Sequence, residues 1–403
     1  MDLLKRAGKL AMVAPLLSGF LTGCGNFWQA PSTTTTSSGC TSNCTTASSG
    51  AFYVLNASTT PQVIGESIVS GKVTGISGSP WTLQAAPYAM AIPPGNSNFL
   101  AVSTTSGVFA YPLTNGALGT GTVVSTDQAY SVQVDMSGAW LIEAIPGTGG
   151  VTVGAIPINS STGASIGTEQ DVSFAVTNAA LQVNKMVISG DNANIFIPLG
   201  AGGTVVVPFN AAVTTGANPL GSKASIIPVA NTGGSALSVG VSPGTAPALF
   251  YIGETLADST GTTGGLRAFN YSSLGSTLTQ ATGSPLTSGG LAPNAILPAA
   301  SGTYVYVANG EGTTSAGNIT GFAITSTGTT ALTYTLTKDT STAAGVQPLA
   351  LAEDSTGTFV FEVGSLGSPY FDSFTFDTTT AGQLDTQITS TKAAEYTAVV
   401  AAP

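Results

Sequence analysis

Residues 292–309 read APNAILPAASGTYVYVAN, and this stretch decides the fold. It begins with a short proline-led segment, passes through a glycine and continues with alternating tyrosines and valines. Aromatic and β-branched residues are enriched in strands, and glycine is typical of the turn between two strands. The stretch therefore predicts a first strand at 293–296 and a second strand at 304–309, joined by a turn.

The same order of elements recurs from Ala51 to the C-terminus. First strands are expected at residues 87–92, 130–134, 181–183, 236–239, 293–296, 348–351 and 396–400. Second strands are expected at 52–56, 99–102, 140–143, 195–197, 250–254, 304–309 and 359–363. Third strands are expected at 108–111, 151–153, 205–207, 266–269, 319–322 and 373–376. The first strands start 43 to 57 residues apart, which is the length of a four-stranded propeller blade.

The two ends of the repeat are out of phase. The chain enters the repeat with a second strand at 52–56 and leaves it with a first strand at 396–400. A linear stack would leave both as unpaired edges, whereas a ring lets them pair in one blade. We therefore predict an all-β, seven-bladed β-propeller of four-stranded blades over residues 51–403, closed by the C-terminal strand. A sandwich-type tandem array is the alternative.

The composition excludes several other classes. With 51 glycines and 22 prolines in 403 residues the chain is no helix bundle, and with 42% apolar residues it is no disordered chain. Nine basic against 19 acidic residues give a net charge of −10, which argues against nucleic acid as a partner. The absence of histidine removes the usual general base and the commonest metal ligand. We expect no metal and no cofactor.

The N-terminus has the features of an export signal. Three basic residues precede an apolar run at 10–21, which is too short to span a bilayer, so residues 1–23 are interpreted as a signal peptide. The run ends in LTGC at 21–24, which resembles a bacterial lipobox and makes Cys24 the lipid-modified residue. An ordinary cleaved signal is the alternative. Gly25 in place of aspartate favours the outer membrane, and a secreted or periplasmic protein is the other expectation.

Residues 24–50 follow as a Ser/Thr-rich segment that we interpret as a flexible tether. It contains Cys40 and Cys44, which in an oxidising envelope are expected to form a disulfide or to remain surface thiols. Two thiols without histidine are too few ligands for a tetrahedral zinc site.

Several short motifs resemble a known family. Four segments are similar to the blades of the 6-phosphogluconolactonase-like lactonase propellers: GSPL at 283–286, APNA at 292–295, SGTYVYVAN at 301–309 and GFAI at 321–324. Two others resemble the blade junction and the hairpin turn of that family, namely GSPW at 78–81 and TNGAL at 114–118. The resemblance runs over residues 51–403. These motifs build blades and are shared with YVTN-repeat surface propellers, so the resemblance implies the fold more directly than the activity.

The resemblance also implies chemistry that this sequence can be checked for. Enzymes of the family open or close a lactone ring above the central channel with histidine, arginine and glutamate side chains. This chain has no histidine, and beyond the signal its only arginine is Arg267. Any histidine-dependent form of that reaction is excluded.

The candidate catalytic residues are Glu254, Arg267 and Glu311. Glu254 and Arg267 flank one loop between a second and a third strand, and Glu311 lies in the equivalent loop of the next blade. An arginine fork binds carboxylates and phosphates, so the pair is expected either to hold an acidic or hydroxylated ligand or to form an ordinary salt bridge. Alignment of the second strands places Asn56, Glu254 and Asn309 at the same position.

The candidate ligand-binding residues are Asn56, Lys185, Asn294 and Asn309. Lys185 is placed in a first strand, where its side chain either enters the channel, with an acid such as Asp191 beside it, or reaches solvent at a bulge. Glu143 and Glu362 lie in second strands and are expected either to be buried acids of raised pKa or to face outward.

Two functions remain open at this stage. The first is a lipid-anchored, catalytically degenerate propeller, a monomer that binds a sugar-like or lactone ligand, or a protein partner, at the channel mouth. The second is a lactone hydrolase that uses carboxylates and Arg267 without histidine. A purely structural repeat protein is a third class.

Overall fold

The computed structural model describes residues 50–69, 72–176, 182–213, 216–244, 248–258, 260–271, 279–311, 315–327, 333–366, 369–390 and 395–403. All regular elements that these residues form are β-strands, and among them there is no helix long and apolar enough to span a membrane. Residues 1–23, Cys24, Cys40 and Cys44 lie outside the described residues. The signal, the lipid anchor and the disulfide therefore stay predictions.

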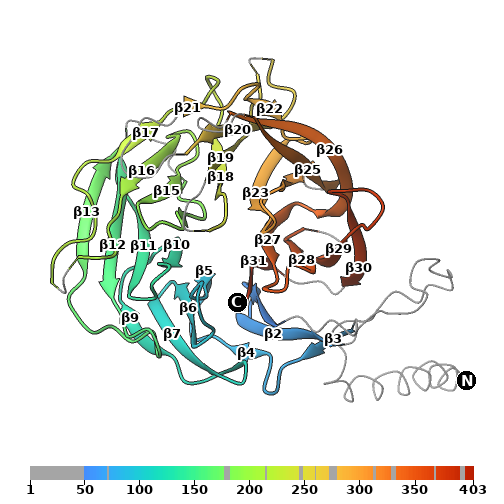
Figure 1. Ribbon diagram of the computed structural model, residues 1–403. Helices are drawn as coiled ribbons and strands as arrows, with labels where there is room; N and C mark the ends of the chain where they lie inside the picture. The colour runs from blue at the N-terminus through green and yellow to red at the C-terminus, as the bar shows by residue number, and fades with distance from the viewer. Residues whose placement is uncertain are drawn as a thin grey trace, which may run out of the picture.

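Seven antiparallel sheets surround a central axis and form a ring (Figure 1). We number them blades 1 to 7 in chain order. Each blade has a path of four strands, and three blades carry an additional short strand. The all-β, seven-bladed propeller of four-stranded blades is confirmed.

The strands of the first four blades run as follows from the axis outward. Blade 1 consists of β31 (Tyr396–Ala401), β1 (Ala51–Asn56), β2 (Gln62–Val69) and β3 (Lys72–Gly75), with β4 (Trp81–Thr82) beside β2. Blade 2 consists of β5 (Pro87–Ala91), β6 (Phe99–Thr104), β7 (Gly107–Thr114) and β8 (Ala117–Leu118), with β9 (Thr122–Ser125) beside β7. Blade 3 consists of β10 (Ser131–Val134), β11 (Trp140–Gly147), β12 (Gly150–Pro157) and β13 (Gln170–Ala175). Blade 4 consists of β14 (Val187–Ile188), β15 (Asn194–Pro198), β16 (Thr204–Pro208) and β17 (Ser225–Ile227).

The remaining three blades follow the same order. Blade 5 consists of β18 (Ala236–Val241), β19 (Leu249–Glu254), β20 (Gly265–Asn270) and β21 (Thr279–Gln280), with β22 (Leu286–Thr287) beside β20. Blade 6 consists of β23 (Ala292–Pro298), β24 (Tyr304–Gly310), β25 (Ala316–Thr327) and β26 (Thr333–Val346). Blade 7 consists of β27 (Pro348–Glu353), β28 (Phe359–Gly364), β29 (Phe371–Phe376) and β30 (Leu384–Ser390).

The two ends of the repeat close the ring in blade 1. β31 pairs with β1 in antiparallel register, with Val399 opposite Val54, and the C-terminus lies beside the blue strands of this blade (Figure 1). The rings of Phe52 and Phe361 stack with centroids 4.2 Å apart and join blade 1 to blade 7. The predicted closure is confirmed, and through it β1 has a neighbouring strand on each side, β2 and β31.

In blades 2, 5 and 7 the second strand is completely buried. All six residues of β6, of β19 and of β28 are buried, because neighbouring strands flank them within the sheet and adjacent blades cover both faces. This explains why these segments are continuous apolar runs in the sequence. It also means that a glutamate in such a run, as in β19 or β28, is buried with it.

Blade 4 departs from the expected pattern at the axis. An inner strand is expected at 181–183, but residues 182 and 183, its described part, form no strand, and the strand that pairs there is β14, only two residues long. The segment before it is held by other bonds, since the Asn184 N–H donates to the Pro198 carbonyl (3.0 Å) and the Met186 N–H donates to Ser131 Oγ (2.8 Å). Lys185 therefore lies in an irregular segment and not in a strand.

Candidate functional site

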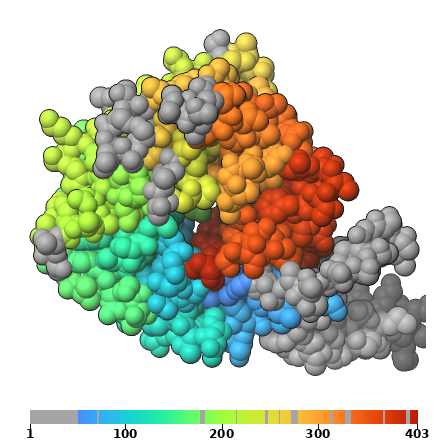
Figure 2. Space-filling model, in the orientation of Figure 1, coloured from blue at the N-terminus to red at the C-terminus, as the bar shows by residue number. Residues whose placement is uncertain are grey.

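A cavity of about 260 Å³ lies on the axis of the ring, and the molecular surface is hollowed at this place (Figure 2). Its wall is built from the beginnings of the inner strands of six blades and, in blade 4, from the irregular segment 182–185. Because every blade contributes, residues from distant parts of the chain meet here. The volume is just below the range of about 300–1,000 Å³ that is typical of small-molecule sites, so the cavity suits only a small ligand.

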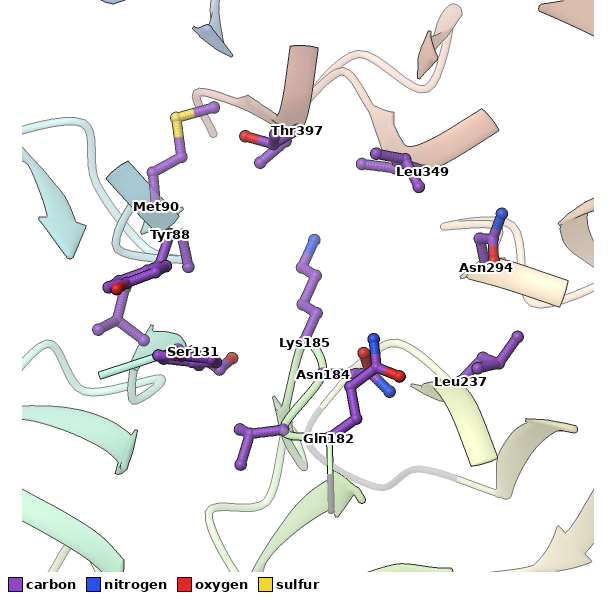
Figure 3. A pocket seen from close by; sticks show the side chains of 16 residues that line it. Tyr88, Met90, Ser131, Gln182, Asn184, Lys185, Leu237, Asn294, Leu349 and Thr397 are labelled. Carbon is purple, nitrogen blue, oxygen red and sulfur yellow. The ribbon is translucent and has the colours of Figure 1, made fainter. Parts of the chain in front are cut away.

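Lys185 is the one charged residue among the 16 that line this channel. Its side chain extends toward the middle of the ring of inner-strand residues (Figure 3). Its side chain is exposed to the solvent of the channel, and partial desolvation by the channel wall lowers the pKa of its ammonium group below the ordinary value. No ion pair of Lys185 is present within the described ranges. Asp191, its expected partner, instead accepts a hydrogen bond from Tyr271 Oη at 3.1 Å.

Polar and aromatic side chains surround the lysine. Asn294 lies on the channel wall and donates through Nδ2 to the Pro348 carbonyl of the next blade at 2.9 Å. Asn184 lies on the wall of blade 4 and donates to the Ala236 carbonyl at 3.2 Å. The rings of Tyr88 and Tyr130 stack with centroids 4.4 Å apart where blades 2 and 3 meet. The channel thus offers one cation, amide groups and an aromatic surface.

Glu254 and Arg267 meet as predicted, but inside a blade. Arg267 Nη1 donates to Glu254 Oε1 at 2.8 Å, and the two residues are 8% and 2% exposed respectively. Arg267 also donates to the Pro228 carbonyl at 2.8 Å, while the Ala230 N–H donates to Glu254 Oε2 at 3.0 Å. The guanidinium lies 5.0 Å from the ring centroid of Phe269. The pair binds blade 5 to the connection from blade 4, and neither residue lines the channel.

Asn309 and Glu311 are brought together in blade 6, away from the channel lining. Fully buried Asn309 donates to the Ser288 carbonyl at 2.9 Å and to Asn318 Oδ1 at 3.1 Å. Asn318 in turn donates to Glu311 Oε1 at 3.4 Å. Asn56 is apart from all of these: its Oδ1 accepts the Ser58 N–H at 3.2 Å and stabilises the turn after β1. Of the predicted ligand-binding residues, Lys185 and Asn294 share the channel.

Glu362 and Asp372 form a buried acidic pair in blade 7. They are opposite each other on β28 and β29 and are 0% and 2% exposed. Burial, and then the charge of Asp372, raise the pKa of Glu362 well above its ordinary value. Burial also raises the pKa of Asp372 to about 6, although Thr389 Oγ1 donates to its Oδ1 at 2.7 Å. The outward orientation considered for Glu362 is wrong.

A cluster of carboxylates between blades 2 and 3 was not foreseen from the sequence. It consists of Asp127, Glu143 and Glu169, whose carboxylate oxygens lie within 4.8 Å of one another. Glu143 is fully buried, so of its two predicted placements the buried acid is confirmed and the outward orientation is wrong. Burial and the neighbouring Glu169 raise the pKa of Glu143 to about 9. The three residues are spread over 43 positions of the chain, and no local motif connects them.

The ring and its axial cavity define the class of the molecule: a seven-bladed propeller with a small cavity on its axis. No family model matches the sequence, and no curated protein matches it. Solved structures do match. A candidate 6-phosphogluconolactonase from Bacteroides uniformis is 16% identical with a TM-score of 0.64, over 87% of this chain and 98% of that one.

Two further solved structures are similar over the same part of the chain. The periplasmic gluconolactonase of Pseudomonas aeruginosa is 16% identical with a TM-score of 0.62, over 89% of this chain and all of that one. A protein from Lactobacillus plantarum is 16% identical with a TM-score of 0.63, over 88% of this chain and 99% of that one. The chain has the fold of these lactonase-like propellers, as its motifs indicated. At this identity the likeness extends to the fold alone.

Proposed function

We propose that the axial channel binds a small hydroxylated anion, such as a sugar acid, and that Lys185 is its cationic anchor. The observation that carries this proposal is the position of Lys185, which is directed into the channel with no acid among the lining residues. An uncompensated cation in a confined channel attracts an anion. Amide groups and stacked tyrosines suit the hydroxyls and the apolar faces of a sugar-like ligand.

The solved gluconolactonase supports the same class of ligand, since a sugar lactone opens to a sugar acid. We propose further, from the sequence, that the propeller is exported and anchored by a lipid at Cys24. In this arrangement the rigid ring is a binding module of the cell envelope.

Lactone hydrolysis is the second candidate, favoured by the projection of the Lys185 amine into the channel together with the lowered pKa of that amine. A neutral amine there would take a proton from water as its oxygen attacks the lactone carbonyl. The same proton would then pass to the ring oxygen as the carbon–oxygen bond breaks. The form of this reaction that uses Glu254 and Arg267 has less support, because the two residues are buried and paired with each other.

The test is calorimetric titration of the purified protein with gluconate and with 6-phosphogluconate. Lys185→Met should weaken binding at least about tenfold, because a hydrogen bond to a charged group contributes about 1.5–3 kcal/mol. Lys338→Met is the matched control, since Lys338 is exposed on β26. Equal affinity of the wild type and Lys185→Met, or no binding by either, would contradict the proposal.

Hydrolysis is tested separately with gluconolactone, by the release of acid. Lys185→Arg keeps the positive charge but cannot lose its proton near neutral pH. It should therefore retain gluconate binding and lose any hydrolysis. A wild type that binds gluconate without opening the lactone is a binding module, and an active Lys185→Arg variant would exclude Lys185 as the base.

A further inference from the structure

Four carboxylates converge where blade 3 meets the connection from blade 2. Glu143 is on β11 and Asp171 on β13, and both are in register with Gly154 on the strand between them. Glu169 directly precedes β13, and Asp127 lies in the connection that leads into β10. Oxygens of Asp127, Glu143 and Glu169 are all within 4.8 Å of one another.

Gly154 provides the space in which these side chains meet. A Cβ atom at this position would lie 2.2 Å from Glu169 Oε1, 3.0 Å from Glu143 Cγ and 3.1 Å from Asp171 Oδ1. Any other residue on the central strand would therefore fill the space that the carboxylates occupy. The absence of a side chain at Gly154 makes a cradle of acidic groups over the middle of the sheet.

The cradle contains buried oxygens that lack a partner. Glu143 is fully buried, and Ser125 Oγ donates to its Oε1 at 3.1 Å. Glu143 Oε2 and Glu169 Oε1 are buried without a donor, so the two carboxyl groups hydrogen-bond to each other only if one of them is protonated. In the part of the chain that the structure describes, no lysine or arginine forms an ion pair with these acids. A buried carboxylate oxygen that is neither hydrogen-bonded nor paired with a cation is costly.

We propose that this cradle binds one Ca²⁺ ion through Asp127, Glu143 and Glu169, with Asp171 beside them. Ca²⁺ binds carboxylate oxygens at 2.3–2.6 Å, so two ligand atoms of one ion are at most about 5 Å apart. The separations in the cradle are within this limit. Ca²⁺ also tolerates irregular sets of six to eight oxygens, which suits side chains from three separate elements.

The ion has a structural role in this arrangement. Asp127 belongs to the connection between the blades, whereas Glu143 and Glu169 belong to blade 3, so a shared ion holds the connection against the blade. None of the four acids lines the axial channel. The proposal is therefore independent of ligand binding at Lys185. A proton shared by Glu143 and Glu169 is the alternative occupant.

The experiment uses protein that has been treated with EDTA and dialysed. Binding of CaCl₂ and, in parallel, of MgCl₂ is measured by calorimetric titration, and the Tm is measured by thermal unfolding with and without each ion. We expect one Ca²⁺ per chain with a Kd on the order of 10⁻⁴ M, and a rise in Tm of about 3 °C at 5 mM Ca²⁺. Mg²⁺ should bind more weakly, because it requires a more regular site.

The variant is Asp127→Asn with Glu169→Gln, since neither residue is fully buried. It should lose the calcium-dependent rise in Tm, and in EDTA it should be at least as stable as the wild type, because two repelling charges are gone. Asp258→Asn, an exposed acid of blade 5, is the control and should keep the calcium-dependent rise in Tm.

A wild type without calcium binding would assign the cradle to a shared proton. A double variant that still binds Ca²⁺ would place the site elsewhere, and either result overturns the proposal.

Discussion

Replacement of Asp372 by asparagine should make the protein more stable at neutral pH and leave its stability at pH 4 unchanged. Asp372 is 2% exposed, and its pKa is raised from 3.8 to about 6 by burial. An acid with a raised pKa in the folded state holds its proton more tightly when folded. Its contribution is fully present below pH 4 and is lost as the pH rises through 6.

The magnitude follows from this shift. A difference of about two pKa units at about 1.4 kcal/mol each amounts to about 3 kcal/mol of stability lost between pH 4 and pH 7. Asparagine avoids this loss, and its carbonyl oxygen can still accept the hydrogen bond from Thr389 Oγ1. Glu362 acts in the same direction, so part of the pH dependence should persist in the variant.

The assay is urea unfolding of the wild type and Asp372→Asn at pH 4, 5, 6 and 7.5. The free energies of unfolding should agree at pH 4 and differ by about 3 kcal/mol at pH 7.5, with the variant more stable. Asp339→Asn is the control for the loss of one exposed charge in the neighbouring blade. The reasoning would be refuted if the free energies of unfolding of the two proteins changed in parallel with pH, or if the variant were less stable than the wild type at pH 7.5.

Three other perturbations test the ring, its buried ion pair and its anchor. Arg267→Met should lower the free energy of unfolding by about 3–5 kcal/mol, because it leaves Glu254 buried without its cation; a loss below 1 kcal/mol in urea unfolding would show that the pair is dispensable. Deletion of residues 396–403 removes β31 and exposes Phe52 and Val54, so cooperative thermal unfolding should be lost; a cooperative transition near the wild-type Tm would contradict closure as the source of stability. Cys24→Ser should release the protein from membranes in cell fractionation, and a variant that stays in the membrane fraction would exclude the lipid anchor.

The sequence was sufficient for the fold because the information about blades is local. The second strands are mainly apolar, since their centres are buried on both faces, and the out-of-phase ends predicted the pairing of β31 with β1. Blade 4 was the exception. Its segment around Lys185 is polar and is held by single hydrogen bonds to Pro198 and Ser131, so neither apolar pattern nor propensity marks its path.

The sites were harder to predict because their residues meet only through register and blade packing. Glu143 and Gly154 are opposite each other on neighbouring strands, and the one-residue precision of that register cannot be obtained from propensities. A glycine in a strand interior was the available signal, since such a glycine often indicates a close approach of other groups. Asp127 joins the cluster from the connection between blades 2 and 3, which no pairing rule predicts.

The placement of the buried polar residues separates structural from functional candidates. In two blades a polar side chain at the same position of the second strand bonds to the connection that leads into that blade: Glu254 with the Ala230 N–H, and Asn309 with the Ser288 carbonyl. A polar contact that recurs at equivalent positions around the ring has a structural role, because every blade must hold the connection that leads into it. This argues that Glu254, Arg267 and Asn309 position blades. Lys185 makes no repeated contact of this kind. It is the charged residue of the channel lining and lies on the irregular segment of blade 4, the blade that departs from the pattern. We therefore assign the proposed binding function to Lys185.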